Sequence, residues 1–145
     1  MSEYTDFPKD FLKRTQDNLE KYSGKYEITN LINNCLGLIV IPKEFIIDNI
    51  EDYELLDSEI KYGISKTNIN FENKNDYSLK NIIRHIRNGI AHGRIEQKSS
   101  EGKIVGLRIF DCNKENSPEN FSIKLSINEM KEFAKELSND FLKKW

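Results

Sequence analysis

Four polar side chains between positions 84 and 92 have the types and the spacing needed for phosphate chemistry. Arg84, Asn88 and His92 recur at four-residue steps, so on a helix they form one row, and Arg87 falls beside that row. The planar fork of an arginine matches phosphate oxygens, and a histidine can gain or lose a proton near neutral pH. An asparagine amide can orient either partner. No carboxylate shares this face, so the set favours metal-independent handling of a phosphodiester.

The same residue types are also typical of a solvated helix surface, and their spacing alone leaves both interpretations open. A zinc site is disfavoured because His85 and His92 are seven residues apart, with no cysteine or acid at ligand spacing. Two ligands do not complete a tetrahedral site. We therefore predict no metal and no other cofactor.

An apolar stripe with helical spacing predicts that these residues lie on a central helix, from a cap at Asp76 or Ser78 to about His92. The stripe consists of Leu79, Ile83, Ile86 and Ile90. Two glycines follow on one side of the helix, each costing about 1 kcal/mol of helix stability relative to alanine. We expect Gly89 to permit close helix packing across a dimer axis, and Gly93 to end the helix in the left-handed conformation.

Helical spacing also predicts two helices before the central one, from about Phe7 to Tyr22 and from Ile28 to a stop at Pro42. Asp6 or Thr5 is the expected cap of the first. Residues 43–76 are harder to interpret, with short apolar turns or helices predicted at 45–50 and 55–60 and a polar surface loop at 66–76. A solvated connection is favoured there over a gate for the site.

After the central helix, the apolar residues recur at every second position, which is the spacing of a strand. Alternation over 105–109 and 121–125 predicts a small antiparallel hairpin or meander near the C-terminus. Ser126 and Glu129 form a capping box for a last amphipathic helix. Asp111 is the one acid of this strand region that could reach the central helix, but we expect it instead to pair with Arg108 or Arg94 or to cap a turn.

Length and composition indicate one domain over residues 1–145. The longest apolar run is too short to cross a bilayer, and the N-terminus does not resemble a signal peptide. Cys35 and Cys112 are far apart in the sequence, as expected of reduced thiols, so we predict a cytoplasmic protein without a membrane partner. The net charge of −2 argues against a broad basic surface, so an RNA contact would be small and salt-sensitive.

The segment Arg87–His92, an arginine and a polar residue followed by three residues and a histidine, resembles the motif of HEPN domains (higher eukaryotes and prokaryotes nucleotide-binding). Residues 31–42 are similar to an early helix of small HEPN proteins from bacterial defence and plasmid contexts. Residues 108–111 and 121–126, with the last helix, are similar to the tail of the same group. The likeness is weakest over residues 43–76.

The resemblance implies an all-α bundle of HEPN type, with the small β element near the C-terminus. It also implies a homodimeric, metal-independent endoribonuclease for single-stranded RNA, acting in bacterial defence or a toxin–antitoxin system with a cognate antitoxin or inhibitor as partner. HEPN nucleases pair two such helices, which implies a composite site containing both copies of Arg87 and His92.

Within such a site, we expect His92 to transfer a proton and Arg87 to bind the phosphate. We expect Asn88 to orient His92 or the phosphate. Arg84 and Arg94 are candidate contacts to the RNA backbone, and His85 is expected to be peripheral. Two alternatives stay open. One is a non-catalytic HEPN-like dimer that binds RNA, a nucleotide or a protein, and the other is a scaffold whose Arg/His face is only a dimer interface.

Overall fold

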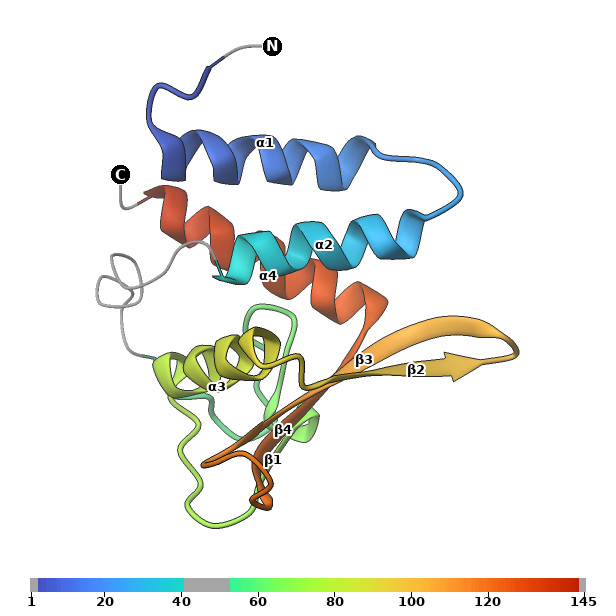
Figure 1. The fold of residues 1–145 in the computed structure, drawn as a ribbon. Helices are drawn as coiled ribbons and strands as arrows, with labels where there is room; N and C mark the ends of the chain where they lie inside the picture. Colours follow the sequence, from blue (N-terminus) through green and yellow to red (C-terminus); the bar gives the residue numbers. More distant parts are fainter. Residues whose placement is uncertain (1–2, 41–52, 144–145) are drawn as a thin grey trace. The chain divides into compact units, whose positions relative to one another are not determined.

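The computed structural model describes residues 3–40 and 53–143, and the chain divides into two compact units (Figure 1). One unit contains α1, α2 and the C-terminal part of α4, and the other contains a four-stranded sheet, α3 and the start of α4. The predictions for 45–50 and for Pro42 lie outside the described residues. Within the described ranges, no helix is both long enough and apolar enough to cross a membrane.

The first unit confirms the two predicted N-terminal helices, α1 (Phe7–Lys21) and α2 (Glu27–Val40), which lie side by side (Figure 1). Pro8 occupies the first turn of α1, where its missing N–H costs nothing. Asp6 is the N-cap by position, but the capping bonds come from Asp10, whose Oδ2 accepts the backbone N–H groups of Thr5 (2.9 Å) and Asp6 (3.1 Å). These bonds lower the pKa of the Asp10 carboxyl.

The second unit shows that the all-α prediction is wrong, because its centre is an antiparallel sheet of four strands in the order β1-β4-β3-β2. The predicted strands after the central helix are β2 (Ile95–Ser100), β3 (Lys103–Cys112) and β4 (Glu119–Ser126). A fourth strand, β1 (Ile69–Phe71), pairs with β4 and lies in the segment expected to be a surface loop. The fold is therefore α+β, with the sheet central rather than a terminal hairpin.

The segment before β1 forms a turn and no helix over 55–60, and a turn is one of the two forms predicted there. Leu55 is buried, whereas Leu56 and Ile60 are exposed. Backbone hydrogen bonds join Leu55 to Tyr77 and Leu79 to Tyr53, so this segment runs beside the entry to α3. A short 3-10 helix, η1 (Lys66–Asn68), follows it. Because Leu55 and Ile64 are almost completely buried, the preference for a solvated connection is wrong for the described residues 53–71.

Helix α3 (Leu79–Ala91) is the predicted central helix, and Ser78 Oγ caps it by accepting the N–H of Asn81. At its end, the N–H groups of Gly93 and Arg94 donate to the carbonyls of Ile90 (3.0 Å) and Gly89 (2.8 Å), which is a Schellman motif. Gly93 has φ +68, so its predicted left-handed cap is confirmed.

Gly89 permits a close approach, but its neighbour is strand β3 of the same chain rather than a second helix. A Cβ at position 89 would lie 2.5 Å from the carbonyl oxygen of Phe110 and 2.7 Å from Cγ2 of Ile109. The other predicted cap is confirmed at the start of α4 (Ile127–Lys143). The backbone N–H of Ser126 donates to Oε1 of Glu129 (2.9 Å), and the backbone N–H of Glu129 donates to Oγ of Ser126 (3.1 Å).

Candidate functional site

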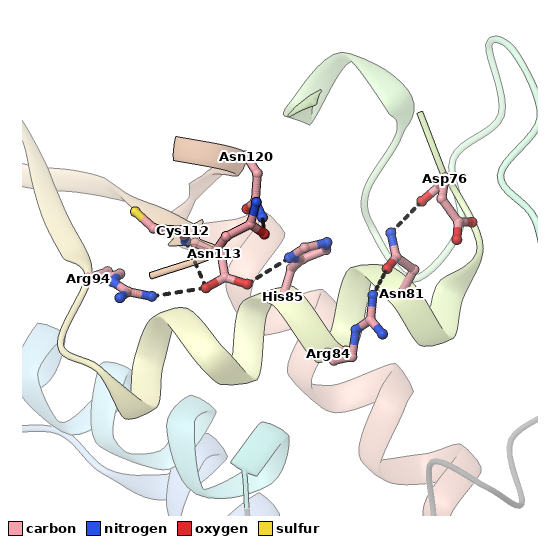
Figure 2. A network of polar contacts seen from close by, with 9 residues as sticks. Asp76, Asn81, Arg84, His85, Arg94, Cys112, Asn113 and Asn120 are labelled. Carbon is pink, nitrogen blue, oxygen red and sulfur yellow. Dashed lines mark hydrogen bonds and ion pairs between the residues drawn. The ribbon is translucent and has the colours of Figure 1, made fainter. Parts of the chain in front are cut away.

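Asp111, near the end of β3, is the centre of a polar network that joins the sheet to α3 (Figure 2). Ile109 and Asp111 share the buried face of the strand because strand side chains alternate, and Asp111 is only 4% exposed. Its Oδ2 lies 2.8 Å from Nδ1 of His85. Its Oδ1 accepts from Nη1 of Arg94 at 3.0 Å and from the backbone N–H of Cys112 at 2.9 Å. Three partners therefore compensate a carboxylate that the sheet removes from water.

His85 belongs to this network. Its expected place at the periphery of the catalytic site stays a prediction. Its ring stacks on Phe121 with a centroid distance of 4.6 Å and an angle of 10° between the planes. Phe121 is the cross-strand partner of Asp111, so strand pairing brings the ring and the carboxylate to the same place. Two sequence signals point to the contact. His85 lies one helical turn before Gly89, the glycine that packs against β3. The alternation of strand side chains from Ile109 places Asp111 on the same face of β3.

A hollow of about 720 Å³, the His92 hollow, lies at the C-terminal end of α3. The lining comes from the end of the helix, from Arg94 and from the end of β3 with the turn that follows it. It consists of Asn88, His92, Arg94 and residues 110–117. His92 is the C-cap of α3 and is exposed. Within residues 3–40 and 53–143 its imidazole has no hydrogen-bond partner, so it is free to contact a ligand.

A second hollow of about 350 Å³, the His85 hollow, lies beside the N-terminal half of α3. It is lined by Phe71, Asn73, Lys74, Asp76, Asn81, Arg84, His85, Asn113 and Asn120. Nη2 of Arg84 donates to Oδ1 of Asn81, and Nδ2 of Asn81 donates to the backbone oxygen of Asp76 at 2.9 Å (Figure 2). A hydrogen bond from the backbone N–H of Ser78 lowers the pKa of the Asp76 carboxyl, so this rim keeps one negative charge at neutral pH.

The structure brings together three of the five predicted site residues and separates the other two. Asn88, His92 and Arg94 line the His92 hollow, whereas Arg84 lines the His85 hollow. Arg87 lines neither. Five positions at 3.6 residues per turn place Arg87 and His92 about 140° apart around the helix axis.

The contact of Asp111 with Arg94 confirms one of its two expected partners, and Arg108 instead pairs with Glu96 and Glu119.

The comparison with protein families decides the assignment. The model of the HEPN pEK499 p136 family matches residues 1–144. The chain belongs to this HEPN family. No curated protein and no solved structure matches it.

In this HEPN chain the family match includes both units and the whole segment that carries the motif. Helix α3 presents that segment between two hollows, and the Asp111 carboxylate contacts the lining of both, through His85 on one side and Arg94 on the other. Among the described residues, cations and the unpartnered imidazole of His92 line these hollows, which is a chemistry that suits an anion such as a phosphate.

Proposed function

We propose that this HEPN protein is a metal-independent endoribonuclease that cleaves single-stranded RNA. The observation that carries the proposal is the position of His92, an exposed imidazole at the end of the motif helix, in an open hollow with Asn88 and the cation Arg94. A hollow of about 720 Å³ is large enough for a nucleotide unit of an RNA strand.

In the proposed reaction the ribose 2′-oxygen attacks the neighbouring phosphorus. A P–O bond forms there, the P–O5′ bond breaks, and the products are a 2′,3′-cyclic phosphate and a 5′-hydroxyl. One group accepts the proton of the 2′-hydroxyl, and another gives a proton to the leaving 5′-oxygen. His92 serves as one of these groups. Arg87 stabilises the charge that develops on the phosphate, and Asn88 orients His92 or the phosphate.

A second copy of the chain completes the site in this proposal. The chain has two histidines, and His85 is committed to Asp111 in the other hollow. A two-histidine acid–base pair therefore needs His92 of a second copy. The divergence of Arg87 and His92 around the helix favours the same conclusion, since one phosphate is contacted more easily by Arg87 of one copy and His92 of the other.

The test is incubation of the purified protein with single-stranded RNA in EDTA. We expect His92→Ala and Arg87→Ala each to slow cleavage by about 10²- to 10⁴-fold, the usual contribution of a positioned acid–base group or of an oxyanion donor. Lys131→Ala is the matched control. Lys131 is an exposed cation on α4 that lines neither hollow, so its loss changes the net charge by the same amount as the loss of Arg87. Cleavage that survives both substitutions would come from a contaminant and would contradict the proposal.

A non-catalytic RNA- or nucleotide-binding HEPN dimer is the second candidate. The observation that favours it is the absence of Arg87 from the lining of the His92 hollow. In that case no variant cleaves RNA under any condition, His92→Ala binds RNA as well as the unchanged protein, and Arg87→Ala binds it less tightly.

For the cellular role we propose bacterial defence or a toxin–antitoxin system, with RNA as target and an antitoxin or inhibitor protein as partner. This rests on the resemblance to small HEPN proteins of such contexts. Induced expression in a bacterial host should arrest growth with the unchanged chain and not with His92→Ala. Equal growth of both strains, at equal protein levels, would argue against this role.

A further inference from the structure

The His85–Asp111 pair has a geometry that a purely structural ion pair does not require. Arg94 alone already neutralises the buried Asp111 carboxylate, yet a second partner, the imidazole of His85, lies 2.8 Å from its other oxygen. With Nδ1 directed to the carboxylate, Nε2 is the ring nitrogen left to meet a ligand in the His85 hollow. The side chain of His85 is 13% exposed, which is enough for one edge to reach that hollow.

The cation next to His85 is also held in place. Arg84 is exposed, but Oδ1 of the nearly buried Asn81 fixes its guanidinium, and Asn81 is itself fixed by the backbone oxygen of Asp76. Five N–H donors are available in an arginine, so the bond to Asn81 leaves others for an anion. Two series of hydrogen bonds thus end at the same hollow (Figure 2). One runs from Asp76 through Asn81 to Arg84, and the other runs from Arg94 through Asp111 to His85.

The charges around the imidazole come from three parts of the chain. Helix α3 contributes Arg84, β3 contributes Asp111 with its partner Arg94, and the segment before α3 contributes Lys74 and Asp76. Among the described residues, β1 and β4 place the apolar rings of Phe71 and Phe121 against the imidazole, and β4 adds the uncharged Asn120 to the lining of the hollow. In the lining, the held Arg84, the exposed Lys74 and the imidazole thus meet one carboxylate, that of Asp76, so the hollow favours an anion.

We propose that the His85 hollow is a second phosphate-ester site, in which Arg84 and the Nε2–H group of protonated His85 donate to the phosphate oxygens. Asp111 is the positioning residue: it holds Nδ1 at 2.8 Å and so leaves Nε2 to face the hollow. Only the choice of RNA as the source of the phosphate rests on the proposed function. A strand bound there would extend along α3 from this site toward the His92 hollow, so the site would hold a nucleotide next to the cleaved linkage.

The experiment uses an RNA oligomer with fluorine in place of every 2′-hydroxyl, so that binding is measured where cleavage is impossible. A second arm uses adenosine monophosphate, a free nucleotide. Because the chain has two histidines, the ¹⁵N imidazole spectrum contains two sets of signals, and His92→Ala leaves only that of His85. We expect a ligand to raise the pH at which the His85 ring titrates and to leave Nδ1 protonated.

Affinity provides the second readout. We expect Arg84→Ala to weaken binding of the fluorinated oligomer by about 10- to 100-fold, the usual value for lost charge-assisted hydrogen bonds. Lys80→Ala, which removes a cation from the same helix but not from the hollow, should have a much smaller effect. Binding should weaken as the pH rises, by up to about tenfold per unit, because one proton is taken up with the ligand. This pH dependence should disappear in His85→Gln.

The outcomes separate this site from the proposed nuclease. A His85 signal that responds to the oligomer in a protein that never cleaves RNA would support the site and contradict the nuclease. Unchanged His85 titration with both ligands, or equal effects of Arg84→Ala and Lys80→Ala, would overturn the site even if cleavage depends on His92. A response to the monophosphate but not to the oligomer would support a phosphate-ester site for a free nucleotide.

Discussion

At the scale of single residues, Asp111 is the side chain on which most other contacts of the site depend. Its carboxylate is buried on the sheet and is compensated by His85, Arg94 and the N–H of Cys112. Removing one partner from a buried charge pair leaves the other charge without compensation, which costs more than the pair itself contributes.

We expect Asp111→Ala to lower the free energy of unfolding by about 3–5 kcal/mol, measured by urea denaturation. The matched control is Glu96→Ala, which breaks an ion pair with Arg108 near the surface and should cost at most about 1 kcal/mol. Similar losses in the two variants would show that burial does not strengthen the Asp111 network.

Glu129 provides a prediction on pH. Burial raises the pKa of its carboxyl, but hydrogen bonds from the Ser126 backbone, the Asn68 side chain and the Ser126 hydroxyl outweigh this and lower it. Because the pKa is lower in the folded state, the charged form contributes stability above the unfolded pKa. That contribution disappears as the pH falls through the folded value.

Glu129→Ala should therefore cost about 1 kcal/mol at neutral pH, as for a lost helix cap. The cost should be much less once the pH has fallen below the folded pKa, where both states of the unchanged protein are protonated. Urea denaturation at a series of pH values measures the difference. A cost that is the same at both ends of the series would assign the effect to packing instead of charge.

At the scale of elements, the end of α3 decides where the site residues lie. Two glycines act there in different ways. Gly89 lets the helix touch the backbone of β3, and Gly93 reverses the chain so that Arg94 returns to Asp111. Without the first contact the helix would stand further from the strand, and His85 would not reach the carboxylate.

We expect Gly89→Ala to destabilise the fold by about 1–3 kcal/mol through overpacking, in spite of the better helix propensity of alanine. Thermal and urea unfolding measure this, and the ¹⁵N signal of His85 should change because its contact with Asp111 loosens. Gly93→Ala is the matched control. A Cβ there meets no atom within 4 Å, so its cost of about 1–2 kcal/mol comes from φ alone and should leave the His85 signal unchanged.

At the scale of the whole molecule, the proposed reaction depends on two copies of the chain. Arg87 and His92 diverge around one helix, so we expect Arg87 of one copy to act with His92 of the other. This can be tested without a structure of the dimer, because each defective chain can supply what the other lacks.

Arg87→Ala and His92→Ala chains carrying different tags should each cleave RNA very slowly alone, whereas the purified mixed species should recover part of the cleavage. Its rate should stay below that of the unchanged protein, because the second His92 of the acid–base pair is missing. The mixed species retains one Arg87 and one His92 on opposite copies. A mixed species as inactive as its parents would show that the two groups must act within one chain. Recovery should be absent when one partner carries both substitutions.

The local features of this protein follow from residue types at short spacing. Ser78 and Gly93 bound the central helix, and Ser126 and Glu129 cap the last one. Such features depend on hydrogen bonds and backbone angles within a few residues, so residue types at short spacing specify them.

Which side chains meet depends on packing between distant segments of the chain. The pairing of Ile69 with Ile123 makes a segment predicted to be a polar loop into a fourth strand, and the fold is α+β. The contact of His85 with Asp111 joins positions 26 residues apart and depends on the packing of Gly89 against β3. Strand pairing and helix–sheet packing are long-range interactions that the period of one segment cannot encode.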